Sequence, residues 1–201
     1  MNVEEVAKLC AALTPKEMEG PLKPLHVNLK ARGEKRLACR LVGELLSNKN
    51  VNSDAFISVL PKIRKFIEDV EIEVVSGNTF SFTFKNVNDR RQVLLGGPWS
   101  FDKVLLVLEA TVGKGDVQNM SFNKVAFWVQ IHNVHLLCMT VEIMRFLSGM
   151  IKEVKEVDEG KSGDYVRKYI QVRVVMNVDE PLRRILRVDV MRDGKEMTML
   201  L

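Results

Sequence analysis

The sequence predicts an α+β fold, in which a βαββαβ unit is followed by an incomplete βαβββ unit packed against it. Strict alternation of apolar and polar residues over 70–84 indicates a two-stranded hairpin. Apolar residues at helical spacing occur on both sides of that hairpin along the chain. A similar order of elements begins again near residue 125, but this second unit has no room for a second helix.

The hairpin is expected to be the centre of a core, because apolar residues occupy every second position of both arms: Val70, Ile72, Val74, Phe80, Phe82 and Phe84. A three-residue loop over 76–78 places both apolar sets on one face, whereas a two-residue loop would put Phe beside Glu. This register pairs Val75 with Thr79, and Gly77 and Asn78 tolerate the positive φ of such a turn. Burial of each phenylalanine contributes about 1.5–3 kcal/mol.

The first unit continues with elements on both sides of the hairpin. We expect a strand over 37–46, a helix over 53–66 capped by Ser53 and kinked at Pro61, and a helix over 88–95. The strand over 103–110 is apolar on both faces and should be covered on both sides. Trp99 is expected to fill the core between the second helix and this strand. The order β-α-β-β-α-β is the ferredoxin-like, or split βαβ, arrangement.

The second unit is expected to contain one helix from Thr140 and strands over 125–134, 151–157, 169–178 and 185–191. Because only 179–184 separate its last two strands, half of its core would be bare unless the two units share one. We therefore divide the chain into four segments: an N-terminal helix and linker (1–32, with the helix over 2–13), the first unit (33–112), the second unit (122–192) and a tail (193–201). The basic run over 30–36 is expected to be a solvated approach to the first strand.

Composition indicates what kind of protein this is but does not identify its function. The 201 residues are 46% hydrophobic, with a mean hydropathy of −0.02, which indicates a globular protein. No apolar run has transmembrane length and the first residues have no signal-peptide pattern, so we expect an intracellular location, nucleus or cytoplasm. Three cysteines without paired spacing indicate reduced thiols. A net charge of +4 permits a polyanionic partner but does not require one.

Two segments of the second unit resemble the strand motifs of the RNA recognition motif. Val129–Val134 resembles its first-strand hexamer, with Gln130 in place of an aromatic residue. Residues 167–174 resemble its third-strand octamer, with Lys168 and Gln171 as departures. Alternation places the candidate site for single-stranded RNA or DNA on the open face of this unit: Trp128, Gln130, Arg167, Tyr169, Gln171 and Arg173.

Each of these side chains has an expected role. Trp128 and Tyr169 would stack on bases, the arginines would neutralise phosphates, and the glutamines would reach base edges. In the alternative interpretation, Trp128 is buried against the first unit and Tyr169 only covers a strand edge.

The open face of the first unit is expected to be scaffold, because it would present no aromatic side chain and two carboxylates that repel phosphates. Its residues are Glu71, Glu73, Thr79, Ser81 and Thr83.

Other motifs do not predict chemistry. His132-x2-His135-x2-Cys138 lacks the paired-ligand spacing of a zinc site, so no metal is expected. Gly160-Lys161-Ser162 lacks the glycine that a phosphate-binding loop needs five positions earlier, where Lys155 stands. No catalytic constellation is present, so we expect no enzyme activity, no cofactor and no small-molecule substrate.

Three further segments are similar to a plant domain of unknown function that precedes a CCHC zinc knuckle in gag-like proteins of LINE-type retrotransposons. They are Gly96–Asp102, Phe127–Val134 and Val154–Asp158, and the resemblance runs from Leu37 to Leu201. It implies nucleic-acid binding. The knuckle spacing Cys-x2-Cys-x4-His-x4-Cys does not occur in this sequence. The alternative is a protein-interaction or self-association module, which the acidic open face of the first unit favours.

Overall fold

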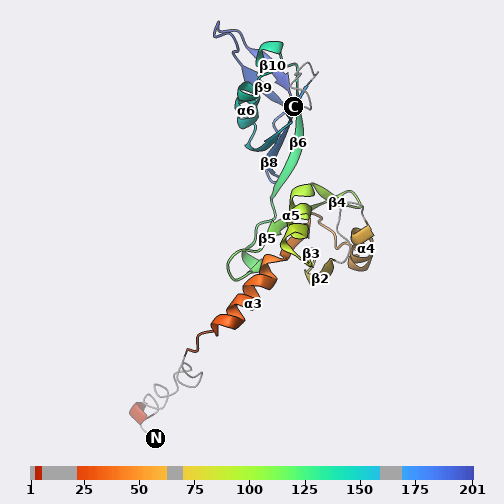
Figure 1. Cartoon of the computed structure of the whole chain (residues 1–201), viewed down its shortest axis with the longest axis vertical. Coiled ribbons are helices and arrows are strands. Elements are labelled where there is room, and N and C mark those ends of the chain that lie inside the picture. The colour runs from red at the N-terminus through yellow and green to blue at the C-terminus, as the bar shows by residue number, and fades with distance from the viewer. Residues whose placement is uncertain (1–2, 6–21, 63–69, 159–168) are drawn as a thin grey trace. The chain divides into compact units, whose positions relative to one another are not determined.

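The computed structural model describes residues 3–5, 22–62, 70–158 and 169–201 (Figure 1). The chain separates into two units, Met1–Arg36 and Leu37–Leu201. The basic run lies mostly in the first unit, within helix α3 (Val27–Ala38), which has no buried residue. The predicted solvation of the basic run is confirmed, because Lys30, Arg32, Lys35 and Arg36 are all exposed, but the helix itself was not predicted. Of the predicted helix over 2–13, only residues 3–5 are described, and they are helical.

The first half of the Leu37–Leu201 unit contains an antiparallel sheet, sheet A, of order β2-β3-β1-β5-β4. Its strands are β1 (Arg40–Leu45), β2 (Glu71–Ser76), β3 (Thr79–Thr83), β4 (Trp99–Phe101) and β5 (Val104–Ala110). Its helices are α4 (Ser53–Val59), the 3-10 turn η1 (Leu60–Lys62) and α5 (Val87–Gly96). The α+β class is therefore confirmed, with one strand more than predicted.

The core of sheet A contains the three phenylalanines that were predicted, Phe80, Phe82 and Phe84, together with Phe56 of α4. Phe56, Phe80 and Phe82 are fully buried, and the ring centroids of Phe56 and Phe80 are 4.4 Å apart. Gly43 on the central strand makes this packing possible, because a Cβ there would lie 2.5 Å from Leu108 Cδ2 and 2.9 Å from the Phe82 ring. The central strand therefore needs a glycine where the phenylalanine approaches it.

The β2–β3 hairpin has the predicted cross-strand pairs but a different turn, and Val74, which was predicted to be buried, is 49% exposed. Val74 pairs with Phe80 and Ile72 with Phe82, which confirms the register. The predicted Val75–Thr79 pair is wrong, because Thr79 pairs with Ser76 and the register shifts between Val74 and Ser76. Val75 is the extra residue of this β-bulge. The bulge restores the register, so the apolar residues of both arms lie on one face although the turn has only two residues. Gly77 has the positive φ (51°) in that turn.

Asn78 holds the loop between β1 and α4 in place. Its Oδ1 accepts a hydrogen bond from Val51 N at 2.9 Å, and its Nδ2 donates to Ser47 O at 3.1 Å and to Lys49 O at 2.9 Å. The loop then leads into α4, whose N-cap is Asn52 rather than the predicted Ser53: Asn52 Oδ1 accepts from Ala55 N at 3.0 Å.

Pro61 lies where the α-helix changes into the 3-10 turn η1, in agreement with the predicted kink. The rest of the predicted helix, residues 63–66, lies outside the described residues.

The additional strand β4 follows α5 directly. Trp99 is 9% exposed and its Nε1 donates to Val93 O at 2.8 Å, which confirms its predicted place in the core. Trp99–Phe101 pairs with β5 across a turn in which Asp102 and Lys103 have positive φ. Leu106 and Val107 are both buried, so β5 is covered on both faces as predicted.

The open face of sheet A is less exposed than predicted. Ser81 is 4% exposed, because it pairs with Val42 on one neighbouring strand and Glu73 on the other. Glu71 and Glu73 remain exposed, and Glu73 lies 3.8 Å from Arg40.

The second half of the unit contains sheet B, which is also antiparallel, with order β7-β8-β6-β10-β9. Its strands are β6 (Lys124–His132), β7 (Glu153–Val157), β8 (Tyr169–Asn177), β9 (Ile185–Val188) and β10 (Met197–Leu200). The 3-10 turn η3 (Leu136–Cys138) and helix α6 (Val141–Gly149) follow β6. The prediction of a tail over 193–201 is wrong, because β10 pairs with β9 from Met197↔Val188 to Leu200↔Ile185.

Sheet B has its own core, so the prediction of one core shared by both sheets is wrong. The two clusters of buried residues have no member in common. Leu186 of β9 and Met199 of β10 are 1% and 0% exposed, and they join Leu147 of α6 and Cys138 of η3. These side chains fill the half of the core that was expected to be bare.

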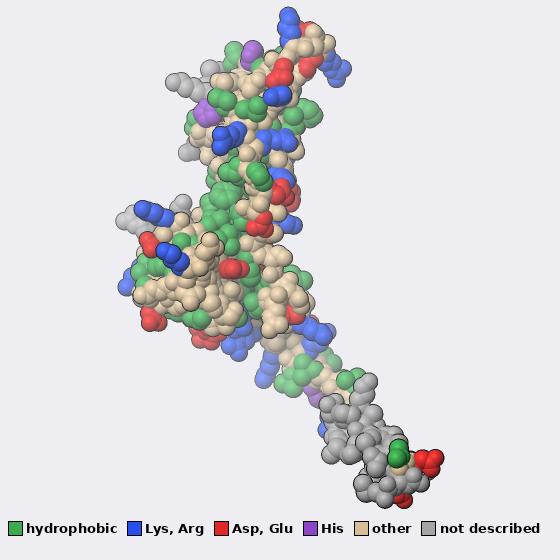
Figure 2. Space-filling view, turned by 180° about the vertical axis from the view of Figure 1, so that it is seen from behind, with side chains coloured by type: hydrophobic (Ala, Val, Ile, Leu, Met, Phe, Trp, Pro, Cys, Tyr) green, Lys and Arg blue, Asp and Glu red, His purple; other side chains and the backbone are tan. Residues whose placement is uncertain are grey.

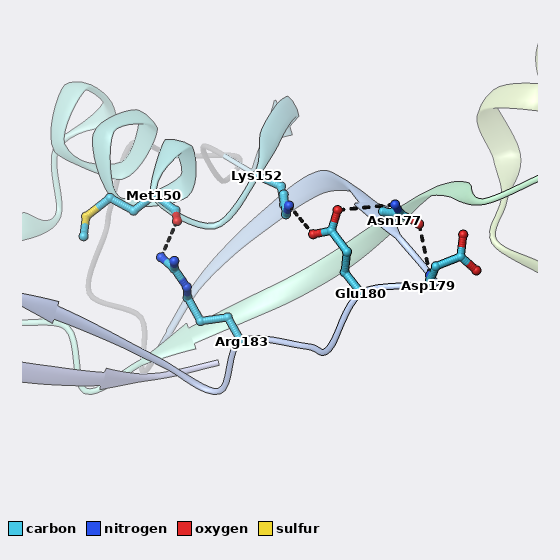
Figure 3. Close-up of polar contacts among 6 residues, drawn as sticks. All are labelled: Met150, Lys152, Asn177, Asp179, Glu180 and Arg183. Carbon is cyan, nitrogen blue, oxygen red and sulfur yellow. Dashed lines mark hydrogen bonds and ion pairs between the residues drawn. The ribbon is translucent and has the colours of Figure 1, made fainter.

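The connection over 178–184 takes the place of the second helix (Figure 3). Arg183 Nη1 donates to Met150 O at 2.6 Å, at the C-cap of α6, where a cation is favourable. Lys152 Nζ contacts Glu180 at 2.5 Å, and this hydrogen bond lowers the pKa of the Glu180 carboxyl. The loop is therefore tied at two points to the turn that follows α6.

Asn78→Ala is expected to destabilise sheet A by about 1–3 kcal/mol, because backbone groups of the β1–α4 loop lose their partners. Urea unfolding measures this change. Asn50→Ala is the matched control, since Asn50 is exposed in the same loop. Equal stability of the two variants would show that Asn78 does not hold the loop.

A fragment of residues 122–201 is expected to fold cooperatively, whereas 122–192 is not, because only the longer fragment contains Met199. Thermal unfolding followed by circular dichroism distinguishes the two. Two similar transitions would mean that β10 is dispensable for the core.

Candidate nucleic-acid interface

The candidate interface depends on the pairing of β6 with β8. The two strands pair without interruption from Lys124↔Asn177 to His132↔Tyr169. Because side chains alternate along each strand, one face buries Ile131, Ile170 and Val172 against α6 and η3. The opposite face of the two strands is here called the open face, and it carries the predicted site residues. Around Arg173 it borders a pocket that Leu94 and Leu95 of α5 also line.

Five of the six predicted site residues lie together on the open face. Trp128 pairs with Arg173 and Gln130 with Gln171, and Tyr169 lies in the next same-face pair. Arg167 lies outside the described residues. His132, the partner of Tyr169, also belongs to this face and was not among the predicted site residues. The alternation that selected Trp128 and Gln130 would also have selected the residue two positions further on.

Trp128 is 40% exposed, so the alternative in which it is buried against the first unit is wrong. The guanidinium carbon of Arg173 lies 6.0 Å from the centroid of the Trp128 ring, within cation–π range. Arg173 Nη2 also donates to Gly97 O at 3.0 Å, and Arg173 is half-buried. Arg173 thus supports the indole ring and holds a backbone carbonyl, in addition to any role toward phosphate.

Tyr169 and His132 form the second aromatic pair of the face. Their ring centroids are 5.3 Å apart, with planes tilted by 45°. His132 Nε2 and Gln130 Oε1 are 3.2 Å apart, which joins the pair to the glutamine beside it. Tyr169 is half-buried.

The open face carries charges of both signs. Arg173 lies opposite Glu156 of β7, and both Glu156 and Lys124 are exposed. Glu153 and Lys155 form an ion pair at 2.6 Å, which lowers the pKa of Glu153. Acidic and basic side chains are likewise interspersed over the side of the molecule seen in Figure 2. The face therefore combines aromatic side chains with charges of both signs that largely balance.

The rejected motifs give no competing site. Cys138 is 2% exposed within the core of sheet B, and this burial raises the pKa of its thiol. In the described part of the chain, no group of three His, Cys, Asp or Glu residues could hold a metal ion. Gly160-Lys161-Ser162 lies outside the described residues. No described helix has both the length and the apolar character needed to cross a membrane.

Comparison with known proteins gives a family match for the first half of the Leu37–Leu201 unit. Residues 33–110 match the model of a family described as a domain of unknown function (DUF4283), and the match includes the Gly96–Asp102 segment. No curated protein matches the chain. A solved structure of the N-terminal three RNA-binding domains of the yeast splicing factor Prp24 is 11% identical, with a TM-score of 0.29. That comparison covers 71% of this chain and 57% of the Prp24 chain, and its score is too low to bear on function.

Proposed function

We propose that this chain is a non-catalytic protein that binds single-stranded RNA or DNA on the open face of sheet B. The observation that supports this function is the grouping of exposed Trp128 and half-buried Tyr169 with Gln130 and Gln171 between them. Stacking on an aromatic side chain contributes about 1–3 kcal/mol per base and tolerates any base, because every base has a π-face. The proposal therefore predicts binding with weak sequence preference.

The spacing of the two aromatic positions suits more than one nucleotide. Trp128 and His132 are four residues apart on β6, which corresponds to about 13 Å along a strand. Adjacent stacked bases are only about 3.4 Å apart in a duplex. A single strand that stacks at both ends must therefore be splayed, and its middle bases would lie over the two glutamines. Glutamine amides can donate to and accept from base edges.

The finer assignment of fold and origin is part of the proposal. Both sheets place their first three strands in the order second-third-first, with a strand pair added beside the first. We assign both to a ferredoxin-like, RNA-recognition-motif-like arrangement, in which the second copy lacks one helix. The resemblance of the Gly96–Asp102 and Phe127–Val134 segments supports an origin in gag-like proteins of plant LINE-type retrotransposons, and the family match over 33–110 covers the first of these segments. Such a protein would act in the nucleus or cytoplasm.

The second candidate function is a protein-interaction or self-association module without nucleic-acid binding. The mixed charge of the open face favours it, because phosphate binding normally uses an excess of basic residues. Exposed Val74 and Val75 on the edge strand β2 also favour it, since an edge strand can pair with another chain.

Trp128→Ala and Tyr169→Ala are each expected to weaken binding of a single-stranded RNA of about 20 nucleotides by about 5- to 150-fold, the loss of one stacking contact. Fluorescence anisotropy measures affinity, and circular dichroism checks that the melting temperature is unchanged. Phe146→Ala is the matched control, because Phe146 is an aromatic residue that is 62% exposed on α6, which packs on the buried face. Its removal should leave affinity unchanged.

Two results would contradict the proposal. A lower melting temperature with unchanged RNA affinity in Tyr169→Ala would make that side chain structural. No binding of the unaltered chain at low salt would favour the interaction module instead.

A further inference from the structure

The proposed binding of a polyanion calls for a second contact, because the aromatic and amide residues of the open face bring little net charge. Arg173, the described arginine among the predicted site residues, already contacts Gly97 O and the Trp128 ring. Electrostatic attraction to phosphates supplies essentially all non-specific affinity for nucleic acid. Helix α3 carries the densest basic run of the described chain and buries none of its residues.

The basic residues of α3 are arranged on one side of the helix. At 100° per residue, Arg32, Lys35 and Arg36 fall within an arc of about 100°, and they span about 6 Å along the helix axis. Lys30 lies on the opposite side, where it pairs with Glu34 at 3.5 Å. Within the described residues, no ion pair involves Arg32, Lys35 or Arg36. The arc is thus a row of three exposed cations without acidic neighbours on it.

We infer that α3 is a second nucleic-acid contact, which binds the phosphodiester backbone through Arg32, Lys35 and Arg36. This inference rests on the proposed function, and it assigns charge neutralisation to a different element from base stacking. Charge complementarity between these cations and phosphate favours nucleic acid as the occupant. Arginine presents a planar fork of donors that matches phosphate oxygens, and lysine adds a point charge. Three such charges within about one helical turn can meet neighbouring phosphates of one strand.

The pattern of apolar residues favours nucleic acid over a lipid surface as the occupant. A helix that lies in a membrane interface needs a continuous apolar face, commonly with Trp, Phe or Leu. Val27 and Leu29 point to opposite sides of α3, and the helix has no aromatic residue. The exposed apolar residues therefore do not form a stripe opposite the basic arc.

The test compares two variants of the full chain that each lose three positive charges. Arg32→Gln/Lys35→Gln/Arg36→Gln removes the arc, and glutamine preserves helix propensity. Arg91→Gln/Lys103→Gln/Lys114→Gln is the matched control, because these residues are exposed in the Leu37–Leu201 unit. Affinity for the same single-stranded RNA is measured as a function of salt concentration. Circular dichroism verifies that both variants remain folded.

The arc variant is expected to reduce the slope of log affinity against log salt by about 2, at about 0.7 per lost phosphate contact. This corresponds to about 100-fold weaker binding at 0.1 M salt relative to the unaltered chain. The control variant should change the slope by less than about 0.7, the value for one phosphate contact. Equal slopes for the two variants would overturn the inference. So would loss of binding to vesicles of anionic phospholipid in the arc variant with unchanged RNA affinity.

The outcome separates this inference from the proposed function. If Trp128→Ala weakens binding and the arc variant does not, the stacking function stands and the role of α3 is wrong. If the arc variant alone weakens binding, α3 is the contact and the open face is not. No RNA binding by the unaltered chain overturns both.

Discussion

The uninterrupted pairing of β6 with β8 is the constraint on which the second half of the molecule depends. Because side chains alternate along each strand, the register of this pairing determines which residues of sheet B are buried and which lie on its open face. The side chains of Ile131 and Val172 enter the core only if Trp128 and Arg173 lie on the opposite face. A shift of one residue would bury an arginine and expose the aliphatic set. The candidate interface is therefore maintained by the same burial energy that holds the sheet together.

Sheet B shows how a repeated strand order can close its core without the second helix. The order of its strands corresponds position by position to that of sheet A. In sheet A, the second helix, α5, contributes Val93 to the core, and Trp99 of the strand that follows it also lies there. In sheet B, Leu186 and Met199 come from the strands themselves, and the connection before them is tied to α6 by Arg183. A short loop with two polar contacts thus replaces a helix.

Features that depend on local periodicity could be predicted from the sequence, and features that depend on distant partners could not. Alternation alone placed Phe80 and Phe82 in a core and put Trp128 and Tyr169 on one face. The bulge at Val75 was missed, because either turn length keeps the alternation on each arm. β10 was missed because Met197–Leu200 is short, and its burial depends on β6 and β9. Helix α3 was missed because it buries nothing and so has no apolar stripe.

The late position of β10 has a consequence for synthesis of the protein. A domain usually folds as its residues leave the ribosome, N-terminal parts first. All strands of sheet A precede residue 111, so its phenylalanine core can close early. In contrast, β6 pairs with β10 through Leu200 and His132, and Met199 belongs to the core of sheet B. Sheet B can therefore be completed only after these late residues have been synthesised. We therefore expect sheet B to remain incomplete, with apolar side chains exposed, for longer during translation than sheet A, and to be the half more prone to aggregation at that stage.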